Sequence, residues 1–334
     1  EKSDGTGEIL SNVVSSQIEE HKEFGGVVPE LAARAHVEKI EFIIKKALKE
    51  SNLDLNNING ISATAGPGLI VCLTVGLNAG KAIAGSLKKP FVAVNHLEGH
   101  ALSPKINNKI KFPYLLLLIS GGHTQFLEVN GVNNYRRLGT TIDDALGEAF
   151  DKTAKLLGIE FPGGPKIEEW AKKGDENYFK LPKPILKKGG CNLSFAGLKT
   201  AVLRVSKRLK NQKEKYHLAA SFQKTINEIL HEKTKVAMEK FLENKKIIKK
   251  TFVIAGGVAA NLRIRENLTK LANKKNFASV FPPINLCSDN AAMIAWAGIE
   301  RFKINLIDDL EFTSKARWPL DSAAPFLKGP GLKL

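Results

Sequence analysis

Cysteine is scarce in this chain of 334 residues, which has only Cys72, Cys191 and Cys287. The three are odd in number and lie far apart, so they form neither a disulfide framework nor a paired cysteine metal site. Such sparse cysteine is typical of proteins in a reducing cytosol. We therefore expect a cytoplasmic protein.

Long apolar runs are lacking too. We find no run of the roughly 18 residues that a membrane-spanning helix needs, and no secretory signal at the start of the chain as given. We therefore expect no membrane association. The chain begins at Glu1, without Met, and we expect that a first segment is missing. The length favours about two domains.

Acidic residues are outnumbered: 34 Asp and Glu face 50 Lys and Arg, for a net charge of +16. Such an excess favours a polyanionic partner, most plausibly a nucleic acid. Much of the excess is lysine in blocks, at 183–188, 207–215 and 245–250. Such blocks also occur on solvated faces of proteins that bind no nucleic acid, so charge alone leaves both interpretations open.

Strand-like and helix-like patterns alternate along the chain, which predicts an α/β protein. Strands are expected at 8–15, 58–64, 91–95, 114–119, 125–130, 135–141, 251–255 and 278–281. Helices are expected at about 31–51, 73–87, 143–158, 197–210, 215–243, 258–275 and 289–302. The helix at 73–87 is rich in Gly and Ala, which indicates close packing against a sheet.

Two histidines, His96 and His100, follow the expected strand at 91–95. Residues four apart share one face of a helix, so both imidazoles can point at one zinc, iron, copper or nickel ion. The alternative is a pair of surface histidines. The zinc-peptidase motif needs Glu directly after the first His. Here Leu97 has that place and Glu98 comes one residue later.

Glycine pairs stand at three junctions, Gly121-Gly122, Gly163-Gly164 and Gly256-Gly257. Backbone amides in such turns can approach an anion closely, and the amino end of a following helix adds positive potential. A tight turn alone would explain each pair. Together the three pairs predict nucleotide or phosphate binding.

Carboxylates at Asp144, Glu148 and Asp151 have helical spacing, and like charges at that spacing repel. A ligand, a metal or a basic partner would account for them, and an exposed acidic face is the alternative. Asp289 precedes the last expected helix, where it is either an N-cap or a third metal ligand. Two histidines and one carboxylate leave open positions on a metal for a substrate.

Nine motifs in this chain closely resemble the TsaD family, the tRNA N6-adenosine threonylcarbamoyltransferases, formerly called the O-sialoglycoprotein endopeptidase family. They are GGVVPE at 25–30, TAGPGL at 64–69, NHLEGH at 95–100, ISGGHTQ at 119–125, DDALGEAFDKTAKLL at 143–157, FPGGP at 161–165, SFAGLKT at 194–200, AGGVAAN at 255–261 and CSDN at 287–290. His123 resembles the bacterial and organellar branch.

The resemblance implies an actin-like ATPase (ASKHA) fold with two α/β lobes and a central cleft. The first lobe would comprise residues 1–113, completed by about 290–334. The second would comprise 114–289, with an inserted helical region at about 174–243. The family's first strand and phosphate hairpin have no counterpart before Glu8.

The resemblance also implies transfer of threonylcarbamoyl from threonylcarbamoyl-AMP to N6 of adenosine 37 in tRNAs that read codons beginning with A. It places one divalent metal ion, Fe2+ favoured over Zn2+, on His96, His100 and Asp289. Substrate or nucleotide contacts fall on Leu118, Ile119, Ser120, Gly121, Gly122, Asp151, Gly164, Glu168 and Asn261. We take Asp151 and Glu148 as the candidate catalytic residues.

The implied partners are tRNA, threonylcarbamoyl-AMP or another adenine nucleotide, a paralogous TsaB-like subunit and a TsaE-like small ATPase. Three other functions stay open at this point. They are a nucleotide-binding scaffold in tRNA processing without its own chemistry, a sugar kinase or chaperone ATPase of the same fold class, and a metallopeptidase.

Overall fold

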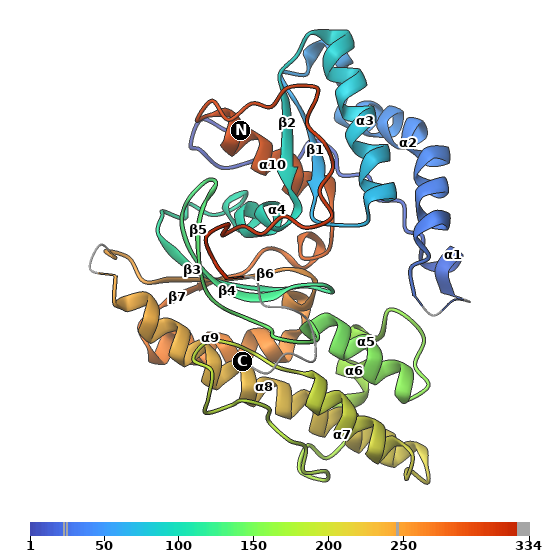
Figure 1. The fold of residues 1–334 in the computed structure, drawn as a ribbon, viewed down its shortest axis with the longest axis vertical. Coiled ribbons are helices and arrows are strands. Elements are labelled where there is room, and N and C mark those ends of the chain that lie inside the picture. The colour runs from blue at the N-terminus through green and yellow to red at the C-terminus, as the bar shows by residue number, and fades with distance from the viewer. Residues whose placement is uncertain (23, 25, 245–246, 326–334) are drawn as a thin grey trace. The chain divides into compact units, whose positions relative to one another are not determined.

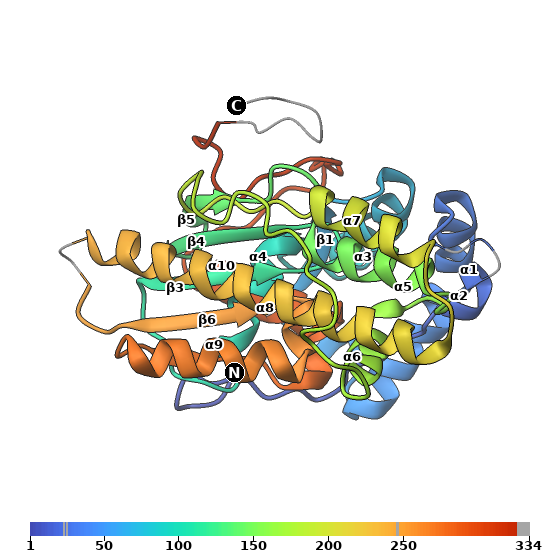
Figure 2. The same cartoon turned by 90° about the horizontal axis from the view of Figure 1, so that it is seen from below.

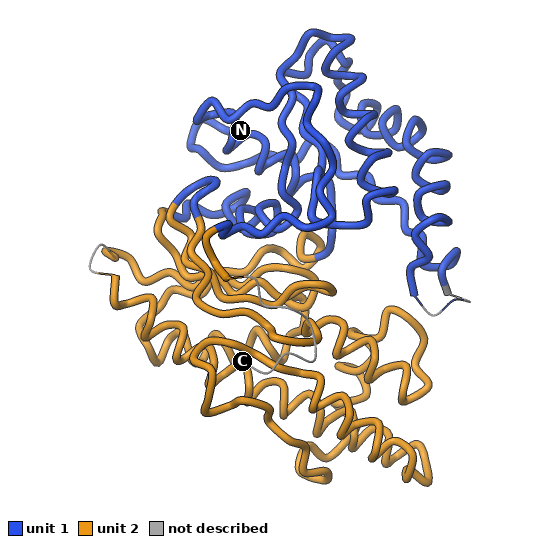
Figure 3. The backbone as a smooth tube through the Cα atoms, in the orientation of Figure 1, with its two compact units in different colours: residues 1–110, 131–134, 288–322 blue, residues 111–130, 135–287, 323–334 orange. Residues whose placement is uncertain are grey.

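The computed structural model describes residues 1–22, 24, 26–244 and 247–325. Gly25, two lysines of the block at 245–250 and the last nine residues of the tail lie outside this set. The chain forms two compact units (Figure 3). Unit 1 comprises 1–110, 131–134 and 288–322, and unit 2 comprises 111–130, 135–287 and 323–334. The expected lobes have other boundaries: they assign 111–113 and the whole tail to the first lobe, and 131–134 and 288–289 to the second.

Unit 1 is built on two parallel strands, β1 (Ile61–Gly66) and β2 (Phe91–Asn95). Parallel neighbours need a crossover connection, and α3 (Ile70–Leu87) provides it. A Cβ at Gly80 of α3 would lie 3.1 Å from the Cβ of Ala63 on β1. The small residues of α3 therefore let it pack closely on the sheet, as the sequence predicted. The other helices of unit 1 are α1 (Ile18–Lys22), α2 (Pro29–Ser51), α4 (His96–Leu102) and α10 (Ala291–Phe302).

Residues 8–15 do not form the strand that their pattern predicted. The backbone there joins no strand ladder with any described residue, and a strand needs a neighbour to satisfy its N–H and C=O groups. An alternating pattern is therefore not sufficient for a strand at this position.

Unit 2 contains a five-stranded sheet in the order β5-β4-β3-β6-β7. Its strands are β3 (Tyr114–Ile119), β4 (Thr124–Gly131), β5 (Asn134–Thr140), β6 (Thr251–Ala255) and β7 (Ala278–Val280). The strand β3 lies at the centre, antiparallel to β4 and parallel to β6, and every residue in it is buried. A continuous apolar run is typical of a strand covered on both faces.

The helices of unit 2 are α5 (Leu146–Leu156), α6 (Gly163–Ala171), α7 (Ala196–Ser206), α8 (Gln212–Leu242) and α9 (Leu262–Lys274). The long helix α8 and its neighbour α9 run across one face of the sheet (Figures 1 and 2). Apolar side chains from β3, β6 and these helices form one continuous core. The expected helical region at 174–243 contains α7 and α8.

Helix α5 begins at Leu146, three residues later than the sequence predicted. The side chain of Asp143 is engaged elsewhere: its Oδ1 accepts the backbone N–H of Phe195 at 2.7 Å and that of Ala196 at 3.3 Å. Asp143 thus caps the start of α7 rather than that of α5. Asp144 precedes α5 as well, so it does not share a helical face with Glu148 and Asp151.

The helix α3 meets the length and composition requirements for crossing a membrane, with 18 residues and a mean hydropathy of 1.5. This differs from the expectation, based on the sequence, of no membrane-spanning run. The observation is weak evidence for a membrane span, because the core helix of a globular protein passes the same test. Only 17% of the residues in this stretch are buried.

Candidate metal centre and nucleotide-binding loops

The structure brings His96, His100 and Asp289 together in unit 1. The Nε2 atoms of His96 and His100 lie 3.3 and 3.1 Å from Oδ1 of Asp289. One ligand atom from each residue lies within 4.8 Å of the others. Three ligand atoms at this separation could hold one metal ion, as the sequence predicted.

Local capping explains why the three side chains are available. The Asn95 side chain accepts the N–H of Leu97 at 2.9 Å and so caps α4 directly after β2. Asn290 caps α10 by accepting the N–H of Met293 at 2.9 Å. The N-cap role that was the alternative for Asp289 is therefore filled by its neighbour, and the Asp289 carboxylate faces the imidazoles.

Burial differs among the three residues. The His100 side chain is fully buried, that of His96 is 22% exposed and that of Asp289 is 76% exposed. Burial lowers the pKa of His100 and so favours the neutral imidazole, which is the form that binds metals. Partial desolvation of the Asp289 carboxyl opposes its ionisation. Hydrogen bonds from His100 and His96 more than reverse that effect and hold its pKa far below the usual range.

The donor set fits a divalent transition-metal ion. Neutral imidazole nitrogens suit zinc, iron, copper and nickel, and two histidines with one carboxylate are used by non-haem iron and catalytic zinc sites. The Nδ1 of His100 is buried and has no hydrogen-bond partner among the described residues. This ring is therefore held by packing and by its contact with Asp289.

The loop after β3 carries the first set of candidate nucleotide contacts, in unit 2. Leu118 and Ile119 are buried in the strand, and Ser120 closes the turn by donating its N–H to the carbonyl of His123 at 2.8 Å. A Cβ at Gly121 or Gly122 would meet no atom within 4 Å. The two glycines therefore border open space that a ligand can approach.

Asp151 lies on α5 beside the start of α6. Its Oδ1 accepts the backbone N–H of Gly163 at 2.9 Å. Burial raises the pKa of Asp151, and hydrogen bonds from the amides of Gly163 and Gly164 partly offset the rise. A Cβ at Gly163 would lie 2.1 Å from that of Ala154, whereas one at Gly164 would meet nothing within 4 Å. Gly163 thus permits close packing, and Gly164 faces open space.

Glu168 and Asn261 meet at the start of α9. Oε1 of Glu168 accepts the N–H of Leu262 at 2.8 Å and that of Arg263 at 3.2 Å. The Asn261 side chain accepts the N–H of Ile264 at 2.9 Å. An additional 3-10 turn at Gly257–Ala260 separates β6 from α9, so the glycine pair does not open the helix directly.

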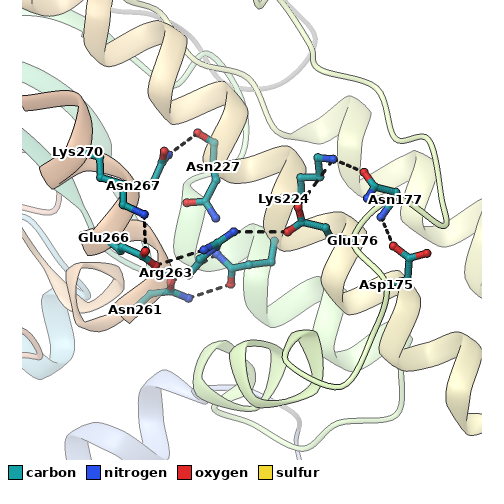
Figure 4. A network of polar contacts seen from close by, with 11 residues as sticks. Asp175, Glu176, Asn177, Lys224, Asn227, Asn261, Arg263, Glu266, Asn267 and Lys270 are labelled. Atoms are coloured by element: carbon teal, nitrogen blue, oxygen red, sulfur yellow. Dashed lines mark hydrogen bonds and ion pairs between the residues drawn. The ribbon is translucent and has the colours of Figure 1, made fainter. Parts of the chain in front are cut away.

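A polar network fixes this start of α9 (Figure 4). The amide of Asn261 pairs with that of Gln223 on α8, with separations of 3.0 and 3.4 Å. Arg263 contacts Glu176 at 3.6 Å and Glu266 at 3.3 Å. Nothing in the sequence pattern singled out Gln223, because its significance depends on α8 passing next to α9.

The remaining carboxylates have separate partners. Asp144 forms ion pairs with Lys199 at 2.5 Å and Lys152 at 3.6 Å. Glu148 pairs with Lys152 at 2.5 Å. The expected row of three carboxylates on one helical face is therefore wrong in the case of Asp144, and lysines neutralise both Asp144 and Glu148.

These features define an α/β protein of two compact units with a two-histidine, one-carboxylate group that could hold a metal. The family model that matches, TsaD: tRNA N6-adenosine threonylcarbamoyltransferase, covers residues 8–296. The chain belongs to this family of acyltransferases.

Proteins named tRNA N6-adenosine threonylcarbamoyltransferase are similar over nearly the whole chain. That of Pelagibacter ubique is 66% identical over 334 residues, which are 100% of this chain and 94% of the relative. That of Zymomonas mobilis is 52% identical over 99% of this chain and 90% of the relative.

Solved structures share the fold at low sequence identity. HypF of T. kodakarensis has a TM-score of 0.60 and 16% identity, covering 80% of this chain and 44% of that one. Full-length HypF in the phosphate- and nucleotide-bound form has a TM-score of 0.56 and 13% identity, covering 83% and 42%. This chain spans less than half of each, and the likeness concerns the fold alone.

Proposed function

We propose that this protein transfers the threonylcarbamoyl group of threonylcarbamoyl-AMP to N6 of adenosine 37 in tRNAs that read codons beginning with A. Membership of the TsaD family over residues 8–296 supports the reaction class. The observation that carries the proposal is the meeting of His96, His100 and Asp289, because residues nearly 200 positions apart converge on one point.

The three residues hold one divalent metal ion, with Fe2+ favoured over Zn2+. When bound, such an ion supplies Lewis acidity towards an oxygen of the acyl-adenylate. The protein contributes by holding the three ligand side chains in fixed positions. His100 is immobilised by full burial, while the partly exposed His96 and the exposed Asp289 leave one side of the group accessible to substrate.

The candidate contacts for an adenine nucleotide are carried by loops of unit 2. The amides of Gly121, Gly122 and Gly164 border open space and can approach an anionic or polar ligand without steric hindrance. Leu118, Ile119 and Ser120 support the first loop, and Glu168 and Asn261 lie together at the start of α9.

Of the two candidate catalytic residues, Asp151 is better suited to accept or hold a proton. Burial raises its pKa towards the working range of a general acid or base. Glu148 forms an ion pair with Lys152. We therefore assign proton handling to Asp151 and a supporting electrostatic role to Glu148.

The basic surface binds tRNA through its phosphates, in the cytoplasm.

The exposed apolar residues of α2 and α3, among them Phe42 (65%) and Val71 (47%), offer a docking face for a paralogous TsaB-like subunit. A TsaE-like small ATPase completes the assembly. The two helices lie side by side in unit 1 (Figure 1).

The test is transfer from threonylcarbamoyl-AMP to unmodified tRNA by the purified protein with its partner subunits, with the modified nucleoside quantified by mass spectrometry. Loss of a metal ligand in Asp289→Ala removes several kcal/mol of transition-state stabilisation, which corresponds to roughly 100-fold or more in rate. Asp309→Ala, another exposed aspartate of unit 1, is the matched control. Full activity and full metal content in Asp289→Ala would refute the assignment.

A further inference from the structure

Glu98 lies between His96 and His100 in the sequence, but its side chain is buried on another face of α4. Its side chain is 1% exposed, and its Oε2 accepts a hydrogen bond from Nη1 of Arg301 at 2.9 Å. Its Oε1 accepts the backbone N–H of Asn133 at 2.8 Å. Arg301, in the last turn of α10, is itself only 8% exposed in its side chain.

Helical geometry separates Glu98 from the metal ligands. His96 and His100 are four residues apart and share a face, whereas a residue two positions from each lies about 200° round the helix. The Glu98 carboxylate therefore points away from the candidate metal centre and towards α10. It is therefore placed neither as a metal ligand nor as the general base of a peptidase.

A buried ion pair is a poor device for stability. Removing two charges from water is costly, and apolar residues of similar size are often equally or more stabilising. The pair is directional, however: it holds only if both helices keep one rotation and one register. Its place in this chain is therefore better explained by geometry than by folding free energy.

The pair joins the two helices that bring the metal ligands together. Helix α4 carries both histidines, and α10 begins two residues after Asp289. At Gly99 the helices already approach closely, since a Cβ there would lie 2.9 Å from Cδ1 of Ile294 on α10. That contact sets the spacing of the helices, and the Glu98–Arg301 pair sets the rotation of α4.

Rotation matters because metal sites tolerate little error. Side-chain tips lie about 5–6 Å from a helix axis, so a turn of α4 by about 20° would move the imidazoles by about 2 Å. Ligand distances in metal sites are defined to about 0.2 Å. Six of the seven residues of α4 are buried, so apolar packing holds the helix in place. Apolar contacts are non-directional, so the ion pair adds the directional restraint that this tolerance requires.

We propose that Glu98 is a positioning residue for the metal centre. Through Arg301 and the Asn133 amide it holds α4 in the rotation that directs His96 and His100 at Asp289. This inference rests on the proposed metal site, and it assigns to the pair a role in metal affinity that is separable from a role in stability.

The experiment measures Co2+ affinity by competition with a chelator, together with the visible absorption spectrum of the bound ion and the thermal unfolding of the metal-free protein. In Glu98→Gln the charge is lost and Arg301 is left buried without its carboxylate. We expect affinity to fall about 10- to 100-fold, as for other groups that orient ligands, with an altered spectrum. Glu128→Gln is the matched control, because Glu128 is also a buried glutamate that pairs with an arginine, Arg136, but in unit 2.

A second variant separates positioning from stability. The double variant Glu98→Met, Arg301→Leu replaces the pair by apolar residues, which are expected to preserve folding. We expect a native unfolding temperature with weakened Co2+ binding and a changed spectrum. Native affinity and spectrum in a folded double variant would overturn the inference and leave the metal site standing. A wild-type protein that binds no Co2+ would overturn the metal site itself.

Discussion

Asp151 combines a buried carboxyl group with two backbone N–H groups at the start of α6. Desolvation raises its pKa more than the amides of Gly163 and Gly164 lower it. A carboxylate kept in such a place costs folding free energy at neutral pH, because the unfolded chain ionises more readily than the folded one. Residues that act in acid-base chemistry or ligand binding commonly carry this cost.

Replacing Asp151 by Asn should therefore stabilise the protein and impair its function. The raised pKa destabilises the wild type increasingly as the pH rises from the ordinary aspartate range to the raised pKa. The effect is absent below that range, where both states are protonated. The Asn variant should thus melt at the wild-type temperature at low pH and above it at neutral pH, while adenine nucleotide binding weakens. Thermal melts between pH 3 and 8 and a nucleotide titration check this, and an unchanged pH profile would contradict it.

At the scale of elements, α10 organises unit 1. Its amino end follows Asp289, its last turn carries Arg301, and its middle lies against β1. A Cβ added to Gly298 would come within 2.8 Å of the Ser62 Cβ and 1.8 Å of its Oγ. The helix can reach the sheet this closely only because residue 298 has no side chain, so the position of α10 depends on this one residue.

Gly298→Ala should destabilise the protein by about 1–3 kcal/mol, the usual cost of overpacking a closely fitted core position. Gly76→Ala on α3 is the matched control, because a Cβ there would meet nothing within 4 Å. In a helix interior that change should stabilise by roughly 0.5–1 kcal/mol. Urea unfolding of both variants measures the two effects. Equal effects would show that α10 does not require the close approach.

At the scale of the whole molecule, the net charge of +16 governs how the protein meets a polyanion. Many lysines at the surface already pair with carboxylates, as Lys270 does with Glu266 at 2.6 Å. Such exposed pairs are weak and are screened by salt. Phosphates can therefore compete for these lysines, and binding depends on the ionic strength.

The affinity for tRNA should fall steeply with salt. About four phosphate contacts would weaken binding roughly 100-fold between about 50 and 200 mM salt. Fluorescence anisotropy with labelled unmodified tRNA measures the slope of log affinity against log salt. The affinity for threonylcarbamoyl-AMP, which has one phosphate group, should change far less and serves as the control. A flat tRNA profile would exclude phosphate contacts as the basis of binding.

The sequence by itself determined features that depend on neighbouring residues. The apolar run at 114–119 is a buried strand, and the spacing of His96 and His100 places both on one face of α4. Periodicity of this kind follows from covalent geometry, which every segment carries with it. The nine motifs likewise sufficed to indicate the family.

Only the tertiary structure decided which distant residues meet. Asp289 lies 189 positions from His100, and Arg301 lies 203 from Glu98, yet each pair is within 3.1 Å. The use of Asp143 as a cap for α7 was equally invisible in the sequence pattern. Such pairings depend on how helices pack on the strands of their unit, which local propensity does not encode. The histidine pair is thus a property of the sequence, and the candidate three-ligand centre is a property of the fold.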